Sequence, residues 1–363
     1  MVIITFLIVL SILVFVHELG HFLIAKATGM RVDEFAIGFP PKIFSKKIGE
    51  TVYSINLFPL GGFVKIYGEN PDDSNNNSTT EKEIGFLDKP KLSRLSVLFA
   101  GVLFNFLFAW LCFAVIFMSG FSAPQGFLGV QGDSKTTITS LYEKGPASIA
   151  GIQPGDEIIQ AQSQGETLSS INADGVIEFI ANHQNSEITF ILNRDGENLS
   201  ISATPVDGIV NDKKALGVSF SDLIKVSLPI HKAIYQGYLT SVEVSQTTAV
   251  AMFHFFGDLF TGKKGVLNEV SGPVGIATMV GQASEIGFSS LVMFVALISI
   301  NLAVLNLIPF PALDGGQILF VIIEWIIRRP IKPRIISILN ISGFALLITL
   351  MIIVTIADIF KFF

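Results

Sequence analysis

The stretch Val16-His17-Glu18-Leu19-Gly20-His21 lies inside an apolar run that begins at Met1. Positions four apart share one face of a helix, so His17 and His21 can present their imidazoles to one Zn²⁺, with Glu18 beside them as general base. The alternative is a pair of core histidines satisfied by hydrogen bonds, which leaves Glu18 in need of a partner. Because ionisable groups in a membrane-spanning helix are costly, we expect these residues to be functional.

The composition indicates a polytopic α-helical membrane protein. Of 363 residues, 50% are hydrophobic and 15% are charged, which is too apolar for an ordinary soluble chain. The net charge of −6 does not favour nucleic-acid binding. Runs long enough to cross about 30 Å of hydrocarbon as helices predict four transmembrane segments, at residues 2–25, 95–118, 289–327 with a break near Pro309, and 335–357.

The distribution of lysine and arginine predicts how the chain is oriented. Segment 26–94 holds ten basic residues and the short turn 328–334 holds four, whereas the 170 residues from 121 to 290 hold nine. Since basic residues concentrate in cytoplasmic loops, we expect segments 26–94 and 328–334 in the cytoplasm. Both termini and residues 121–288 are then outside the cytoplasmic (inner) membrane.

The first two transmembrane segments, within residues 1–122, flank a stretch with β character. Residues 51–55 alternate, Pro59-Leu60-Gly61-Gly62 predicts a turn, and 63–66 returns. We expect a β-hairpin at the cytoplasmic membrane surface, followed by a disordered loop at 70–83. The hairpin either caps the bundle or offers a strand edge to an extended peptide, in which case Gly61 and Gly62 lie in a substrate site.

Residues 123–206 have the composition of an inserted, extracytoplasmic α+β domain. The run from Ala150 to Ile158, A-G-x-x-P-G-D-x-I, resembles a PDZ domain of the bacterial protease type, with a helix predicted at 173–182 and strands at 187–193 and 198–204. The resemblance implies that Leu128, Gly129 and Val130 form a loop that binds peptide C-termini. The alternative is a shell that obstructs access and binds no peptide.

Residues 207–288 are predicted to form extracytoplasmic amphipathic helices against the outer leaflet, ending in a turn at 271–276. His183, His231 and His254 have no companion at ligand spacing, so we expect them at the surface or the membrane interface. Cys112, the one cysteine, forms no internal disulfide and is predicted to face lipid or to pack in the core.

The last two segments, within 289–363, supply the missing zinc ligand. Zinc held by two histidines needs a third protein ligand and a position for water, and Asp314 is the only carboxylate between Glu285 and Glu324. The break near Pro309 brings Asp314 to about the depth of His17, close to the cytoplasmic face. Asp314 can also be a helix N-cap.

Three asparagines in the predicted spans have two possible roles. Asn105, Asn301 and Asn306 either join helices by hydrogen bonds or bind the backbone of an extended substrate.

Five motifs carry a family resemblance: HELGH at 17–21, PLGGFVKI at 59–66, AGVLFN at 100–105, SGPVGI at 271–276 and NLIPFPALDGG at 306–316. With them the chain resembles the site-2 protease family of intramembrane zinc metalloproteases, and within it the bacterial regulator of sigma-E protease group. The resemblance implies one Zn²⁺ held by His17, His21 and Asp314, Glu18 as catalytic acid/base, and Asn301 and Asn306 as substrate-holding residues. Val102 departs from the proline usual in the family, and one PDZ domain is recognisable where some relatives have two.

The expected reaction is hydrolysis of transmembrane segments of single-pass proteins that have already been trimmed outside, such as an anti-sigma factor or remnant signal peptides. Glu18 takes a proton from the attacking water and passes it to the leaving amine. The substrate helix must unwind first, and strand pairing with residues 51–67 would hold it extended. Two rival classes are a secondary transporter and a scaffold that uses the PDZ domain to bind partners. The sequence shows no inverted repeat of its hydropathy pattern, which argues against the transporter.

Overall fold

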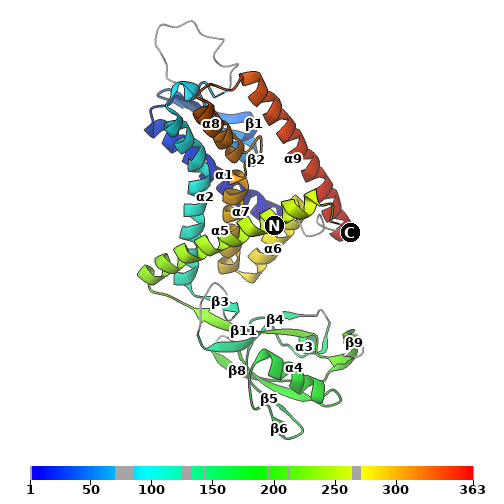
Figure 1. The fold of residues 1–363 in the computed structure, drawn as a ribbon. Coiled ribbons are helices and arrows are strands. Elements are labelled where there is room, and N and C mark those ends of the chain that lie inside the picture. The colour runs from blue at the N-terminus through cyan, green and yellow to red at the C-terminus, as the bar shows by residue number, and fades with distance from the viewer. Residues whose placement is uncertain are drawn as a thin grey trace. The chain divides into compact units, whose positions relative to one another are not determined.

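The computed structural model describes residues 2–69, 85–124, 132–142, 144–194, 196–210, 213–263 and 271–362. The chain forms two compact units (Figure 1). We call Met1–Met118 with Pro229–Phe363 the helical unit, and Ser119–Leu228 the sheet unit. Each is described by itself.

The helical unit contains helices that agree with the predicted spans. Those long and apolar enough to cross a membrane are α1, α2, α7 and residues 334–360 of α9, which confirms four such helices among the described residues. The third predicted run is broken at 308–313, so its second half is a separate short helix. The helices are α1 (Val2–Ala27), α2 (Lys91–Ser119), α5 (Ile230–Phe260), α6 (Pro273–Ile286), α7 (Phe288–Leu307), α8 (Asp314–Ile327) and α9 (Pro333–Phe362), with a 3₁₀ turn at Phe86–Asp88.

Helix α2 is the best buried of the four candidate spans. Half of its most apolar window is buried, compared with 11% for α1 and 17% for α9. Gly20 of α1 lies so close to α2 that a Cβ there would be 2.5 Å from the Ala100 carbonyl oxygen, and the Trp110 indole donates to the Ile234 carbonyl of α5 at 2.8 Å. Small residues and interhelical hydrogen bonds drive helix association in lipid, so α2 anchors both neighbours.

The sheet of the helical unit differs from the predicted hairpin. Strand β1 (Val32–Ile48) pairs with β2 (Thr51–Ile66), and β2 continues through the predicted turn at 59–62. Glu34 lies opposite both Lys65 and Val52, so residues 34–37 separate the two halves of β2. The prediction that 51–55 pairs with 63–66 is therefore wrong, because alternation shows that a segment is a strand but not which strand it pairs with.

The sheet unit is built on a sheet in the order β3-β11-β4-β5-β7-β8, with β6 beside β5. Helix α4 (Ala173–Asn182) matches the predicted helix, and Asn172 caps it by accepting from Gly175 N. The other elements are β3 (Phe121–Pro124), β4 (Ser134–Leu141), α3 (Pro146–Ile149), β5 (Glu157–Ser163), β6 (Glu166–Thr167), β7 (Ile188–Arg194), β8 (Glu197–Ala203), β11 (Val218–Val226), and the separate pair β9 (Val206–Val210) and β10 (Lys213–Ala215).

The boundary expected at residue 206 is wrong. Strand β11 lies between β3 and β4, so residues 218–226 complete the sheet rather than begin amphipathic helices. The rest of the predicted amphipathic segment is one helix, α5. Residues 271–276 are not a simple turn, because α6 begins at Pro273, where the fixed φ of proline suits a first helical turn.

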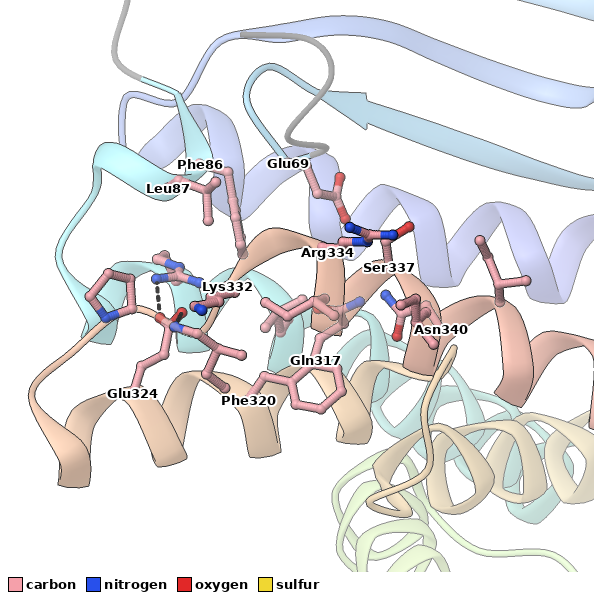
Figure 2. A pocket seen from close by; sticks show the side chains of 17 residues that line it. Glu69, Phe86, Leu87, Gln317, Phe320, Glu324, Lys332, Arg334, Ser337 and Asn340 are labelled. Carbon is pink, nitrogen blue, oxygen red and sulfur yellow. Dashed lines mark hydrogen bonds and ion pairs between the residues drawn. The ribbon is translucent and has the colours of Figure 1, made fainter.

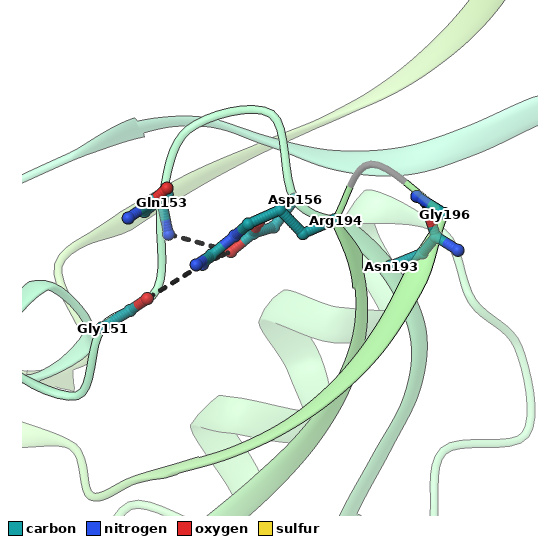
Figure 3. Close-up of polar contacts among 6 residues, drawn as sticks. All are labelled: Gly151, Gln153, Asp156, Asn193, Arg194 and Gly196. Atoms are coloured by element: carbon teal, nitrogen blue, oxygen red, sulfur yellow. Dashed lines mark hydrogen bonds and ion pairs between the residues drawn. The ribbon is translucent and has the colours of Figure 1, made fainter.

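The Gly-Asp turn of the sheet unit is held by one ion pair (Figure 3). Asp156, 1% exposed, accepts from Arg194 Nε and Nη2 at 2.7 Å each and from Gln153 N at 2.9 Å. Arg194 Nη2 also donates to the Gly151 carbonyl at 2.9 Å. Burial raises the pKa of Asp156, but the hydrogen bonds and charge of Arg194 outweigh it and hold that pKa below its ordinary value. This pair ties the turn to the end of β7.

His183 is more buried than predicted, and Cys112 lies in one of its two predicted environments, the core. His183, expected at the surface or an interface, is 9% exposed and its Nδ1 donates to the Phe179 carbonyl at 2.9 Å. Cys112 is 8% exposed and packs in the protein core. His231 and His254 are exposed.

Candidate metal centre

Helix α1 presents two histidines on one face. His21 is buried, and its Nδ1 lies 2.8 Å from the Val97 carbonyl oxygen of α2. Because a carbonyl can only accept, Nδ1 carries the hydrogen and Nε2 is left free to bind a metal. The two Nε2 atoms of His17 and His21 lie 3.1 Å apart.

The loop between α7 and α8 positions Asp314 as the first residue of α8. Gly315 and Gly316 let the start of this helix lie directly on the loop backbone: a Cβ at Gly315 would be 2.5 Å from the Leu307 carbonyl carbon, and one at Gly316 2.7 Å from that of Phe310. The N-cap is Leu313, without a side-chain hydrogen bond, so the N-cap role considered for Asp314 is wrong. Its carboxylate faces α1 instead.

The three donor atoms form a triangle of the size that zinc requires. Asp314 Oδ2 lies 3.1 Å from His17 Nε2 and 3.3 Å from His21 Nε2. Ligand atoms about 2.0–2.1 Å from a tetrahedral zinc are about 3.3 Å from one another. Among the described residues, Asp314 Oδ2 is also a buried oxygen without a conventional hydrogen-bond partner. The two imidazoles and the carboxylate therefore fit a zinc ion.

Gly101 of α2 leaves space in front of both imidazoles. A Cβ at this position would press on His21 Nε2 and lie 2.6 Å from His17 Cε1 and 2.8 Å from His17 Nε2. Any side chain would therefore collide with the ligand nitrogens. In the sequence Gly101 stood out as part of the AGVLFN motif at 100–105, which did not indicate that it faces the metal centre.

Glu18 lies between the centre and strand β2. Its carboxylate accepts a backbone hydrogen bond from Val64, and a Cβ on Gly62 would be 3.8 Å from Glu18 Cγ. Ser11 Oγ donates to the Pro59 carbonyl at 2.7 Å, which joins α1 to the same strand. Residues 62–64 thus pass beside the predicted general base, although they form no hairpin turn.

The other predicted site residues, the three asparagines, lie in three different environments. Asn105 is fully buried, with its Nδ2 3.3 Å from His17 Nδ1. Asn301 accepts from Thr248 of α5 at 3.2 Å, and Asn306 is half-buried near the end of α7. The predicted peptide loop at 128–130 lies outside the described residues.

A cavity of about 1020 Å³ borders α8 and α9 on the side of Gln317, one turn after Asp314 (Figure 2). Its wall contains the Arg94–Glu324 ion pair at 2.8 Å, whose side chains are 9% and 5% exposed. Glu324 also accepts from Ile331 N at 3.1 Å, and the Arg94 guanidinium lies 5.1 Å from the centre of the Phe86 ring. These contacts fix the C-terminal end of α8, whereas Asp314 is at its N-terminal end.

A His-Glu-x-x-His helix face completed by a distant aspartate, in a chain with membrane-length helices, defines a membrane metalloprotease. The model of the family described as Peptidase family M50 matches residues 5–350. The chain belongs to this family, the site-2 proteases, and is a bacterial zinc metalloprotease associated with the membrane.

Curated relatives cover the chain almost end to end. A putative zinc metalloprotease of Clostridium perfringens is 33% identical over 99% of this chain and 98% of its own length. The zinc metalloprotease RasP of Geobacillus kaustophilus is 31% identical over 99% and 98%. The regulator of sigma-W protease RasP of Bacillus subtilis is 30% identical over 99% of each chain.

Proposed function

We propose that this chain is an intramembrane endopeptidase that cleaves transmembrane segments of single-pass proteins whose outer parts have been removed. The proposal is carried by the triangle that His17 and His21 of the membrane-length helix α1 form with Asp314 at the start of the short helix α8. The name of the Bacillus subtilis relative, regulator of sigma-W protease, supports an anti-sigma factor as one substrate. Remnant signal peptides are a second substrate class.

In the proposed reaction, His17, His21 and Asp314 hold Zn²⁺ and Glu18 moves the proton. A bound zinc ion supplies Lewis acidity, which polarises the scissile carbonyl and makes water a better nucleophile at neutral pH. Glu18 removes a proton from the attacking water and delivers it to the leaving amine. The hydrogen bond from Val64 N holds the Glu18 carboxylate in place between α1 and β2.

The substrate is proposed to bind as a strand along residues 62–66. A helical carbonyl is hydrogen-bonded and shielded, so the cleaved segment must unwind before water can attack it. Residues 62–66 pair with β1 as a strand, and Glu18 lies beside them through its hydrogen bond from Val64 N. A substrate strand is proposed to add beside Glu18. Gly61 and Gly62 would admit the substrate backbone, and Asn301 and Asn306 would bind its amides.

The sheet unit is proposed to be an extracytoplasmic PDZ domain that excludes substrates with bulky outer parts, or binds their C-termini through residues 128–130. Both chain termini are placed outside the inner membrane, and the zinc centre near its cytoplasmic face. The excess of basic residues in 26–94 and 328–334 supports this orientation.

The decisive experiment compares purified variants for zinc content and for cleavage of a transmembrane reporter peptide. Glu18→Gln is expected to keep one zinc per chain and to lose at least about 100-fold in cleavage rate, the usual contribution of a general base. Asp314→Ala is expected to lose the zinc. Glu285→Gln, at an exposed position on α6, is the matched control. Cleavage by Glu18→Gln at the wild-type rate would contradict the mechanism.

A further inference from the structure

We propose that Asn105 is a positioning residue for zinc: its side-chain oxygen accepts a hydrogen bond from His17 Nδ1 and so keeps Nε2 free to bind the ion. This inference rests on the zinc centre proposed above. It assigns Asn105 a role toward the metal ligand, in place of the helix-joining and substrate-binding roles considered from the sequence.

Asn105 is well placed to act on His17 alone. It lies on α2, is 0% exposed, and its amide is 3.3 Å from His17 Nδ1. Its backbone is fixed as well, because Ser299 Oγ of α7 donates to the Asn105 carbonyl at 2.8 Å. A side chain without exposed surface does not contact a substrate, so the Asn105 amide acts on the His17 imidazole instead.

The geometry of the centre decides which nitrogen of His17 binds metal. His17 Nε2, and not Nδ1, forms the triangle with His21 Nε2 and Asp314 Oδ2. A neutral imidazole that binds through Nε2 carries its hydrogen on Nδ1. His17 therefore needs an acceptor at Nδ1, as His21 has in the Val97 carbonyl.

The orientation of the Asn105 amide follows from this requirement. In the structure Nδ2 of Asn105 faces His17 Nδ1, which would set two donors against each other once His17 Nε2 binds zinc. The oxygen and nitrogen of an amide have nearly the same shape and are assigned from their hydrogen bonds. Oδ1 has no hydrogen-bond partner among the described residues, so no contact of that oxygen holds the amide in this orientation. His17 alone decides, and it requires Oδ1.

An acceptor of this kind fixes the ring plane and makes the ligand nitrogen more basic. Loss of such an outer partner typically costs about 10- to 100-fold in metal affinity. A carboxylate in the same place serves equally well, because carboxylate–histidine–zinc arrangements are common. If Asn105 served only in packing, the two variants would rank the other way. An apolar side chain of similar size, such as leucine, would be tolerated, and the buried charge of an aspartate would not.

The test measures zinc affinity of the purified full-length chain by competition with a chelator. Asn105→Leu is expected to bind zinc about 10- to 100-fold more weakly, and Asn105→Asp within about threefold of wild type or more tightly. Thr240→Val is the control, because Thr240 is also fully buried and its hydroxyl has no partner among the described residues. Its zinc affinity should be unchanged.

Two outcomes overturn the proposal. Wild-type affinity in Asn105→Leu would show that no acceptor is needed, and weak binding by Asn105→Asp that melts like wild type without zinc would show that the amide nitrogen matters instead. If Asn105→Leu does not fold, the aspartate variant still decides. Failure of the centre itself looks different, because wild type would then bind no zinc or Asp314→Ala would bind it equally well.

Discussion

Substitution of Gly101 by alanine should weaken zinc binding strongly without unfolding the helices. The new methyl group would press on His21 Nε2 and lie 2.8 Å from His17 Nε2, about 0.6 Å short of the 3.4 Å at which ordinary contact begins. Metal–ligand distances tolerate only about 0.2 Å. The forced movement is therefore roughly three times what a bound ion permits. We expect zinc affinity to fall at least about 100-fold, which is more than the usual effect of removing a hydrogen-bond partner of a ligand.

The assay is chelator competition on the purified chain, with thermal unfolding of the zinc-free protein measured in parallel. Gly257→Ala on α5 is the matched control, because a Cβ there meets no atom within 4 Å; alanine is the better helix former, so this variant should bind zinc normally. Zinc binding by Gly101→Ala with wild-type stoichiometry and affinity would refute the packing of α2 against the two imidazoles.

Two further predictions concern ion pairs away from the centre. Arg94→Met should destabilise the chain by about 3–5 kcal/mol, because it leaves the buried Glu324 charge unpaired, and adding Glu324→Met should recover much of that loss; thermal melts of the three proteins check this. Asp156→Asn should cost the sheet unit about 2 kcal/mol, seen as faster limited proteolysis between residues 119 and 228 of the full-length chain. Since the folded-state pKa of Asp156 is held below its ordinary value, the stabilisation is complete above an unfolded pKa of about 3.9 and is lost as pH falls through the folded value. Asp156→Asn should remove this dependence of stability on pH, and an unchanged dependence in the acid range would contradict the prediction.

Periodicity and elimination predicted much of this molecule from the sequence. Length and hydropathy identified the four long helices, and the i, i+4 spacing put His17 and His21 on one face. Asp314 could be chosen because no other carboxylate lies between Glu285 and Glu324. The structure brings Asp314 within 3.3 Å of both imidazoles. These inferences needed only the pattern along one segment or a count of residue types.

The errors occur where the answer depends on which segments meet. Residues 34–37 carry no turn residue that reveals their place between the halves of β2, and β11 joins a sheet whose other strands lie at least 15 residues away in the chain. Gly101 has no side chain to reveal a function. Asn105 could be recognised as a costly amide in a span, but its partner depended on the rotation of α2 about its own axis.

The metal centre takes its geometry from backbones that approach one another closely. Gly20 sets α1 against α2, Gly101 keeps the face toward the imidazoles free, and Gly315-Gly316 seats Asp314 on the preceding loop. Lipid gives helices no hydrophobic reason to associate, so such contacts have to hold the bundle together. They also leave the ligands little freedom to relax, which is what a metal centre with fixed ligand distances requires. Residues too small to carry chemistry therefore decide whether His17, His21 and Asp314 can act together.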